Sequence, residues 1–171
     1  MPPDAALPPG FRADHAADPL ATATERAAAG ADPGTVFHGD LGDRCQLAVV
    51  LAPDHPIDDA TALALGAGAL RDALASLAPV GVPIAIAAGH VVLNEGVAAT
   101  VRVRSAADWL VLAIDVAIDL RRPDPGLDPC HTCLAEEGFA ASAAEVMAAF
   151  CRHLLVGIDA WTEGVARRVA A

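Results

Sequence analysis

The sequence predicts one α+β domain, in which a mixed, mostly antiparallel sheet is flanked by helices. Two observations lead to this fold class. Apolar runs of strand length follow one another with short turns between them, and other segments carry apolar residues at helical spacing. The chain has 171 residues, of which 54% are hydrophobic and 19% are charged. This length suits a single domain, and the composition excludes intrinsic disorder.

The N-terminal part predicts an arm, a short helix and two strands. Residues 1–19 are rich in proline and alanine and predict a flexible arm, so the domain is expected to span residues 20–171. A short helix is expected over residues 20–30, which end at a glycine. A strand is expected at Thr35–His38, and the nearly continuous apolar run Gln46–Ala52 predicts a buried central strand.

A longer helix is expected next. Asp58 or Asp59 would cap it, and it would run to about Ser76. Its leucines at spacings of three, four and seven share one face: Leu63, Leu70, Leu74 and Leu77. Gly66 and Gly68 lie inside this helix, where each costs up to about 1 kcal/mol. We therefore expect close packing against a neighbour to compensate.

The middle of the chain predicts four strands, over residues 84–87, 90–93, 97–104 and 109–120. The second and third are joined by Asn94-Glu95-Gly96, which has the composition of a hairpin turn. In the last two, apolar residues alternate with polar or small ones, which is typical of a sheet with one buried face.

The C-terminal part predicts one further helix. A turn-rich connector over residues 121–129 leads to a short segment at residues 132–134. Ser142 is then followed three residues later by Glu145, the pattern of a capping box at a helix start.

The charge composition excludes several classes of function. The net charge of −11 creates no general attraction for nucleic acid or for an anionic membrane. All eleven basic residues are arginines, so Schiff-base chemistry and a phosphate-loop lysine are excluded. We expect no signal peptide and no membrane-spanning segment, and therefore a cytoplasmic protein with reduced cysteines.

A series of short strings from Asp32 to the C-terminus resembles a known family. They are Asp32-Pro-Gly-Thr35, Gln46-Leu-Ala-Val-Val-Leu-Ala-Pro53, Val91-Val-Leu-Asn-Glu-Gly-Val97, Asp108-Trp-Leu-Val-Leu112, Thr132-Cys-Leu-Ala-Glu-Glu-Gly138, Arg152-His-Leu154 and Trp161. In this order they are similar to the biotin/lipoate A/B protein ligases, in particular short bacterial members. The resemblance implies the fold of the ligase catalytic domain.

The resemblance also implies a site for an acyl-adenylate. In active members a loop rich in glycine and arginine cradles it, and here the corresponding loop is residues 39–44. The family's lysine would fall near Ala87 or Ala88, where this chain has none. Adenylation with ATP and magnesium is therefore expected only if an arginine or a histidine takes over the lysine's role.

Five residues are candidates for binding a substrate. Arg44 and Arg102 are the expected anion contacts, and His90 precedes the hairpin where the ligases place polar side chains. Ala99 stands where the family has small residues that let a ligand approach the strand. His153 faces the core side of its helix, where it would either be a buried hydrogen-bonded histidine or line the ligand cleft.

We assign no metal site. Cys130 and Cys133 form a C-x-x-C pair, but Cys151 and His153 point about 200° apart on a helix and cannot converge on one ion. Cys130, Cys133 and His153 stay open as a metal-binding alternative. Asp115 and Asp119 share one strand face, which we interpret as solvated, with a cation site as the alternative.

Three functions follow from these observations. The first is a degenerate ligase-like domain that binds a small carboxylic acid, such as biotin or lipoate, or an acyl-carrier-type partner protein, without efficient adenylation. The second is an active biotin- or lipoate-type ligase that uses arginine in place of lysine. The third is a small metal-binding protein built on Cys130 and Cys133. Whether the domain forms a homodimer stays open.

Overall fold

The computed structural model describes residues 6–121 and 128–169. In chain order its elements are β1 (Arg12–His15), α1 (Pro19–Ala28), β2 (Thr35–His38), β3 (Arg44–Leu51), α2 (Asp59–Leu77), β4 (Ile84–Ala87), β5 (His90–Leu93), β6 (Gly96–Ser105), β7 (Leu110–Ala117) and α3 (Ala143–Val169).

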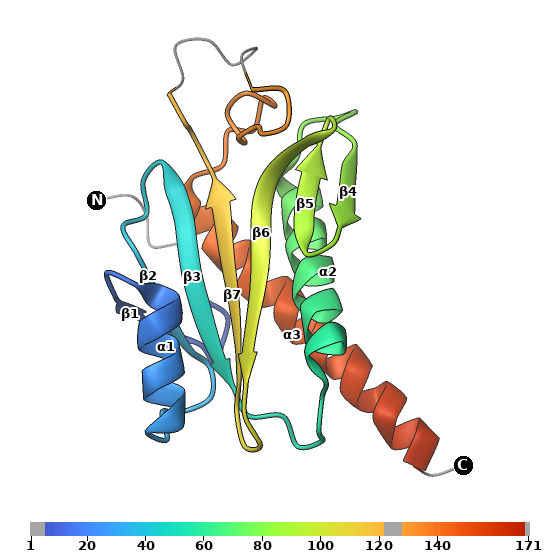
Figure 1. Ribbon diagram of the computed structural model, residues 1–171. Coiled ribbons are helices and arrows are strands. Elements are labelled where there is room, and N and C mark those ends of the chain that lie inside the picture. Colours follow the sequence, from blue (N-terminus) through green and yellow to red (C-terminus); the bar gives the residue numbers. More distant parts are fainter. Residues whose placement is uncertain (1–5, 122–127, 170–171) are drawn as a thin grey trace.

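The strands form one seven-stranded sheet in the order β1-β2-β3-β7-β6-β5-β4. Neighbouring strands are antiparallel, except that β1 runs parallel to β2. The long helices α2 and α3 pack on one face of this sheet, and α1 lies on the other face over β2, β3 and β7 (Figure 1). The predicted fold class, a mixed and mostly antiparallel sheet flanked by helices, is confirmed.

Side chains at the helix starts explain where the helices begin. The Asp18 carboxylate accepts a hydrogen bond from the Ala21 N–H at 3.0 Å, and Asp58 accepts one from the Thr61 N–H at 2.8 Å. The bonds from Thr61 hold the pKa of Asp58 below its ordinary value. At α3 the predicted capping box is present, because Ser142 and Glu145 bond each other's backbone N–H groups.

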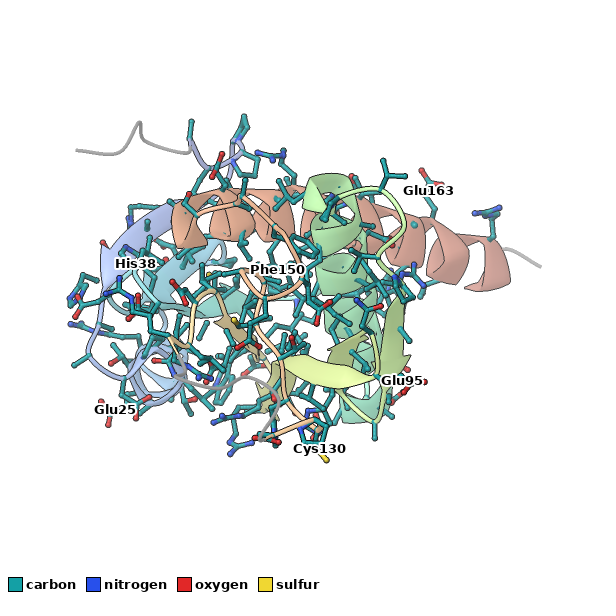
Figure 2. All side chains as sticks on the ribbon, turned by 90° about the horizontal axis from the view of Figure 1, so that it is seen from above. Glu25, His38, Glu95, Cys130, Phe150 and Glu163 are labelled. Carbon is teal, nitrogen blue, oxygen red and sulfur yellow. The ribbon has the colours of Figure 1, made fainter. Side chains whose placement is uncertain are left out.

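Period-two alternation divides the core into two layers. Leu47, Leu112 and Ile114 face α2 and α3 and pack in the larger cluster with Phe150, which lies near the centre of the molecule (Figure 2). The alternate residues of β3 and β7, together with Phe37, form a smaller cluster with alanines of α1. Because α1 spans only part of the sheet, the remaining half of this face is left open.

The structure departs most clearly from the sequence prediction at two places. Within the expected flexible arm, Arg12–His15 forms strand β1, whose four side chains are all exposed. The predicted strand over residues 109–120 ends at Ala117. The expected short segment at residues 132–134 is neither helix nor strand, and neighbouring His131 makes a single bridge to Val97. Most of the predicted connector, residues 122–127, lies outside the described residues.

No helix in the described ranges is both long enough and apolar enough to cross a membrane.

The two glycines inside α2 have different surroundings. A Cβ atom at Gly66 would lie 3.1 Å from Val101 Cγ1 and 3.2 Å from Leu112 Cδ2, so the sheet approaches the helix closely there. Close packing is thus confirmed for Gly66. The prediction of close packing is wrong for Gly68, where an added Cβ would meet nothing within 4 Å.

This contrast predicts opposite effects of one substitution. Gly66→Leu is expected to lower the free energy of unfolding by about 2 kcal/mol, because the extra atoms would enter a filled core. Gly68→Leu is expected to be neutral or to stabilise by up to about 0.8 kcal/mol, because the helix gains propensity. Urea denaturation of both variants measures the difference, and equal effects at the two positions would contradict the packing argument.

Candidate functional site

A row of polar side chains crosses the open half of the sheet. His90 on β5 is paired with Thr100 on β6, Thr100 with Asp115 on β7, and Asp115 with Gln46 on β3. Directly paired residues on neighbouring strands share one face of a sheet. The register therefore places four polar side chains side by side across four strands.

Asp115 lies at the centre of this row and is fully engaged. The Arg44 guanidinium donates to its Oδ1 from Nε at 2.9 Å and from Nη2 at 2.7 Å, and Gln46 Nε2 donates to its Oδ2 at 2.9 Å. The Asp115 side chain is only 17% exposed. Its negative charge is thus compensated by Arg44. At the other end of the row, His90 Nδ1 lies 3.2 Å from Thr100 Oγ1.

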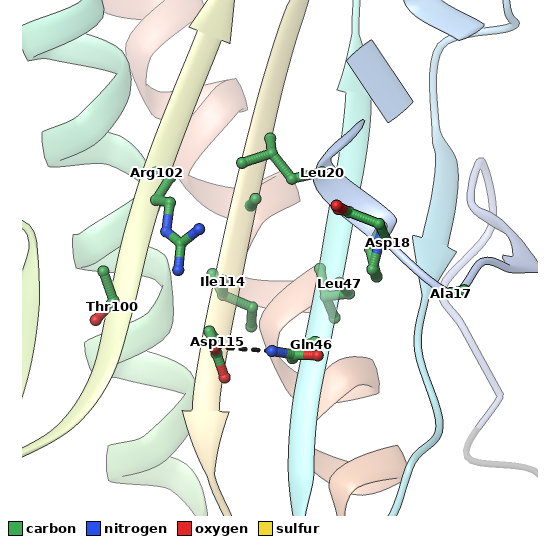
Figure 3. Close-up of a pocket in the computed structure, with 11 residues that line it drawn as sticks. Ala17, Asp18, Leu20, Gln46, Leu47, Thr100, Arg102, Ile114 and Asp115 are labelled. Atoms are coloured by element: carbon green, nitrogen blue, oxygen red, sulfur yellow. Dashed lines mark hydrogen bonds between the residues drawn. The ribbon is translucent and has the colours of Figure 1, made fainter. Parts of the chain in front are cut away.

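A pocket of about 280 Å³ lies over this row (Figure 3). One wall is the start of α1, residues 17–20, and the sheet residues that line it include Gln46, Thr100 and Arg102. Arg102 is two residues beyond Thr100 on the same face of β6, and its guanidinium extends toward β7. Within the described part of the chain its guanidinium has neither an ion pair nor a hydrogen-bond partner, although the pocket wall also carries the Asp18 carboxylate, which caps α1.

The loop over residues 39–44 borders the site and is tied to the strands around it. Asp40 Oδ1 lies within hydrogen-bond distance of His15 Nε2, at 3.0 Å. Asp43 Oδ1 forms an ion pair with Arg121 Nη2 at 3.3 Å. The backbone carbonyl of Asp43 also accepts hydrogen bonds from the N–H groups of residues 118 and 119. The loop thus presents two carboxylates, and its own arginine, Arg44, is held by Asp115.

The structure brings together some of the predicted site residues and separates others. Arg44, His90 and Arg102 lie on the open face of the sheet. Ala99 is 2% exposed, and its side chain packs in the core that faces α2 and α3. His153 is half-buried on α3, which covers the opposite face from Arg102.

Sequence reasoning missed Gln46 and Thr100 as site residues, and it weighed Asp115 only as a solvated residue or a cation ligand. Alternation placed Thr100 and Asp115 on the polar faces of their strands, whereas Gln46 begins an apolar run that was predicted to be buried. The sequence alone does not show the pairing register, which aligns His90, Thr100, Asp115 and Gln46 across four strands. Asp119 lies beyond the end of β7 and accepts a hydrogen bond from the N–H of Arg121.

The cysteines lie apart from the pocket. Cys130 is exposed at the edge of the molecule, whereas Cys45, Cys133 and Cys151 are buried (Figure 2). Burial raises the pKa of Cys45 and of Cys151 to about 12 in each case. Among residues 6–121 and 128–169, no three histidine, cysteine or acidic side chains are grouped so that they could hold a metal ion.

Solved structures show the same fold. A biotin protein ligase-like protein of unknown function from Silicibacter sp. TM1040 is 30% identical, with a TM-score of 0.79; the match covers 93% of this chain and 74% of that one. The biotin protein ligase from Aquifex aeolicus is 17% identical, with a TM-score of 0.72 and coverage of 90% and 72%. The biotin protein ligase from Leishmania major, in complex with biotinyl-5-AMP, is 16% identical, with a TM-score of 0.62 and coverage of 92% and 76%.

The family comparison covers nearly the whole chain. No match is found among curated proteins. The model of the biotin/lipoate A/B protein ligase family matches residues 7–171. Together with the 30% identity to the Silicibacter protein and the shared fold, this match shows that the chain belongs to the biotin/lipoate A/B protein ligase family.

Proposed function

We propose that this protein binds a small carboxylic acid in the pocket beside Arg102 and does not adenylate it efficiently. The observation that carries the proposal is the guanidinium of Arg102 at the pocket, which is unpaired within the described residues. The chain has 22 acidic residues against 11 arginines, and yet no carboxylate in the described part pairs with this one. Arginine is well suited to a carboxylate, because its planar fork of N–H donors matches the two oxygens.

The surroundings of the pocket argue against efficient adenylation. Activation of an acid by ATP places negative charge on phosphate, which an enzyme stabilises with preorganised cations. The loop over residues 39–44 instead presents Asp40 and Asp43, and its arginine is already bound to Asp115. The chain offers no lysine as a substitute. These residues fit a magnesium-bound triphosphate poorly, and we derive no catalytic step through ATP.

Biotin is the first acid to test. Relatives from Aquifex aeolicus and Leishmania major have been solved in complex with biotin, and lipoate and octanoate are the acids to compare with it. A partner protein of the acyl-carrier type would dock where the bound acid is accessible, at the open half of the sheet.

Calorimetric titration with each acid, with and without ATP and magnesium, tests the proposal. The expected result is acid binding that ATP leaves unchanged. Arg102→Ala is expected to weaken it by about tenfold to a hundredfold, which corresponds to the loss of a charge-assisted hydrogen bond.

Arg104→Ala is the matched control. Arg104 lies two residues further along the same face of β6 and outside the pocket, where its Nη1 donates to the carbonyl of Val103. Equal acid affinity in Arg102→Ala and Arg104→Ala would contradict the assignment of Arg102. Binding that tightens sharply with ATP would instead support the active ligase, with Arg44 released from Asp115.

A further inference from the structure

A second pocket, of about 450 Å³, lies at the far end of β3 from the loop over residues 39–44. It forms where the chain leaves β3 toward α2, at residues 53–57, and where the hairpin between β6 and β7 turns, at residues 105–110 (Figure 1). None of the described residues lines both this pocket and the one beside Arg102. We call it the hairpin pocket, and a ligand in it would occupy a site distinct from the acid site.

Part of the wall of the hairpin pocket is apolar. Trp109 and Leu110 line it from the hairpin, and Pro53, Pro56 and Ile57 line it from the segment that leads to α2. The Trp109 indole packs against the smaller core cluster and is only partly buried, so part of its ring is left for a ligand. A cavity of this size with an aliphatic and aromatic side suits the body of a small organic molecule.

The two sides of the hairpin pocket are tied together. Ser105, which lines the pocket, donates a hydrogen bond from its hydroxyl to Asp59 Oδ1 at the start of α2, at 2.6 Å. Asp58 is held in the same turn, because its carboxylate accepts from the N–H and from the hydroxyl of Thr61, at 2.8 Å in each case. The two carboxylates at the start of α2 are thus engaged, and the hairpin is fixed against the helix.

The carboxylates that line the hairpin pocket have no such partners. Asp54 comes from the segment after β3 and Asp108 comes from the hairpin. Within the described part of the chain neither carboxylate has a hydrogen bond or an ion pair. His55 is the other titratable group of the lining, and the described lining residues include no arginine. Arg104, the nearest arginine along the hairpin, donates to the carbonyl of Val103. The negative charge of the pocket is therefore left without a fixed counter-charge.

We propose that the hairpin pocket binds a small organic cation, a primary ammonium group carried on an aryl or alkyl body. The ammonium would lie near Asp54 and Asp108, and the body would lie against Trp109. An indole attracts a cation in addition to covering apolar surface. Each exposed carboxylate contributes only modestly, so the charge and the apolar wall have to act together. The net charge of −11 adds a long-range attraction for cations.

Two ligands with the same ring and stem test the proposal: 2-phenylethylamine carries the charge and 2-phenylethanol does not. At pH 8 an alkylamine is protonated, whereas imidazole side chains are ordinarily neutral. By calorimetric titration at this pH we expect the amine to bind about tenfold more tightly than the alcohol. This ratio of affinities should fall as salt is added, because salt screens exposed charges.

A lysine side chain carries the same ammonium group on the stem of a protein residue. N-acetyl-lysine amide is therefore titrated beside 2-phenylethylamine, and we expect it to bind more weakly because it offers no ring to Trp109. Tighter binding of the lysine derivative would overturn the small-molecule assignment in favour of a lysine from a partner protein.

Tryptophan fluorescence locates the bound amine. The chain has two tryptophans, so Trp161→Phe leaves Trp109 as the only one. The amine should change the emission of Trp109 in this variant. It should leave the emission of Trp161 unchanged in Trp109→Phe, because Trp161 does not line the hairpin pocket. A change confined to Trp161 would place the amine elsewhere and overturn the assignment.

Paired substitutions test the two carboxylates. The double variant Asp54→Asn, Asp108→Asn removes both charges and keeps the shape of both side chains, so the amine-to-alcohol ratio should fall to near one while the affinity for the alcohol is unchanged. The double variant Asp72→Asn, Asp159→Asn is the matched control, because it removes the same charge from exposed residues outside the pocket. All four residues are exposed, so both variants are expected to fold, and circular dichroism checks that they do.

The outcomes also keep this proposal apart from the acid site. Equal affinity of the parent protein for the amine and the alcohol, or binding of neither, would overturn the proposal. An equal loss of amine affinity in the two double variants would overturn it as well, because net charge alone would then be the attraction. Arg102→Ala should leave amine binding unchanged, so a failure of the proposed acid binding would leave the cation site standing.

Discussion

Raising the pH from 9 to 12 is expected to destabilise this protein steeply, through two buried thiols. Burial raises the pKa of Cys45 from 9.0 to about 12, with smaller effects from Cys151 and Asp115, and burial raises the pKa of Cys151 to about 12 as well. Well below pH 9 both thiols are protonated in the folded and unfolded states. Above it the unfolded chain releases these protons and the folded chain keeps them, so the free energy of unfolding falls as the pH rises.

The composition makes this effect easy to assign. Lysine and tyrosine ordinarily titrate near pH 10, and this chain contains neither. Cys45 and Cys151 each contribute a slope of up to about 1.4 kcal/mol per pH unit, so this pair should dominate the fall in unfolding free energy between the unfolded and folded pKa values. Urea denaturation under a reducing agent, at steps from pH 8 to 11, measures the slope directly.

Single alanine variants separate the contributions. Cys45→Ala and Cys151→Ala should each remove about half of the slope, whatever they do to stability at pH 8. Cys130→Ala serves as the control, because Cys130 is exposed to solvent before and after unfolding. A slope unchanged in the double variant Cys45→Ala, Cys151→Ala would refute this assignment.

The elements that could be predicted from the sequence are those with a local physical signal. Thr35–His38, Ile84–Ala87 and His90–Leu93 were predicted with the bounds that the structure has, because apolar runs and turn residues delimit them. Ser142 was predicted as a helix start, and so was Asp58 with Asp59 as the alternative, because capping is local chemistry; the structure uses Asp58.

Strand β1 had no such signal. Its residues are polar or small and all exposed, and its place in the sheet comes from backbone pairing with β2. Such pairing depends on a partner 23 positions away, as in Arg12 and Thr35. A local pattern contains no information about it.

The candidate site likewise combines residues that a local pattern indicates with residues that only long-range strand pairing brings together. The family resemblance drew attention to Arg44, His90 and Arg102, and alternation alone placed Thr100 and Arg102 on one face. That Thr100, Asp115 and Gln46 form one row follows from register across three strands, which a single sequence does not specify. His153 is half-buried on α3, and the helical angle could not tell which face of the sheet α3 covers.

Replacement of Gly34 by alanine is expected to lower the free energy of unfolding by about 3 kcal/mol or more. Gly34 has φ +84°, where a side chain costs about 1–2 kcal/mol. An added Cβ would in addition overlap the backbone carbonyl oxygen of Gly10. The backbone has little room to relax, because the Gly34 N–H donates to Val50 and its carbonyl accepts from the Arg12 N–H.

Gly30→Ala is the matched control for this prediction, measured by urea denaturation alongside Gly34→Ala. Gly30 has the same φ of +84°, and a Cβ there would meet nothing within 4 Å, so only the backbone strain of about 1–2 kcal/mol is expected. The extra loss at Gly34 would come from displacing the segment that forms β1 and leads into residues 17–20, the wall of the pocket. Gly34→Ala should therefore also weaken acid binding under conditions where it is still folded, and Gly30→Ala should not. Equal destabilisation by the two variants would mean that the N-terminal segment moves aside at little cost, and that β1 does not hold the pocket wall in place.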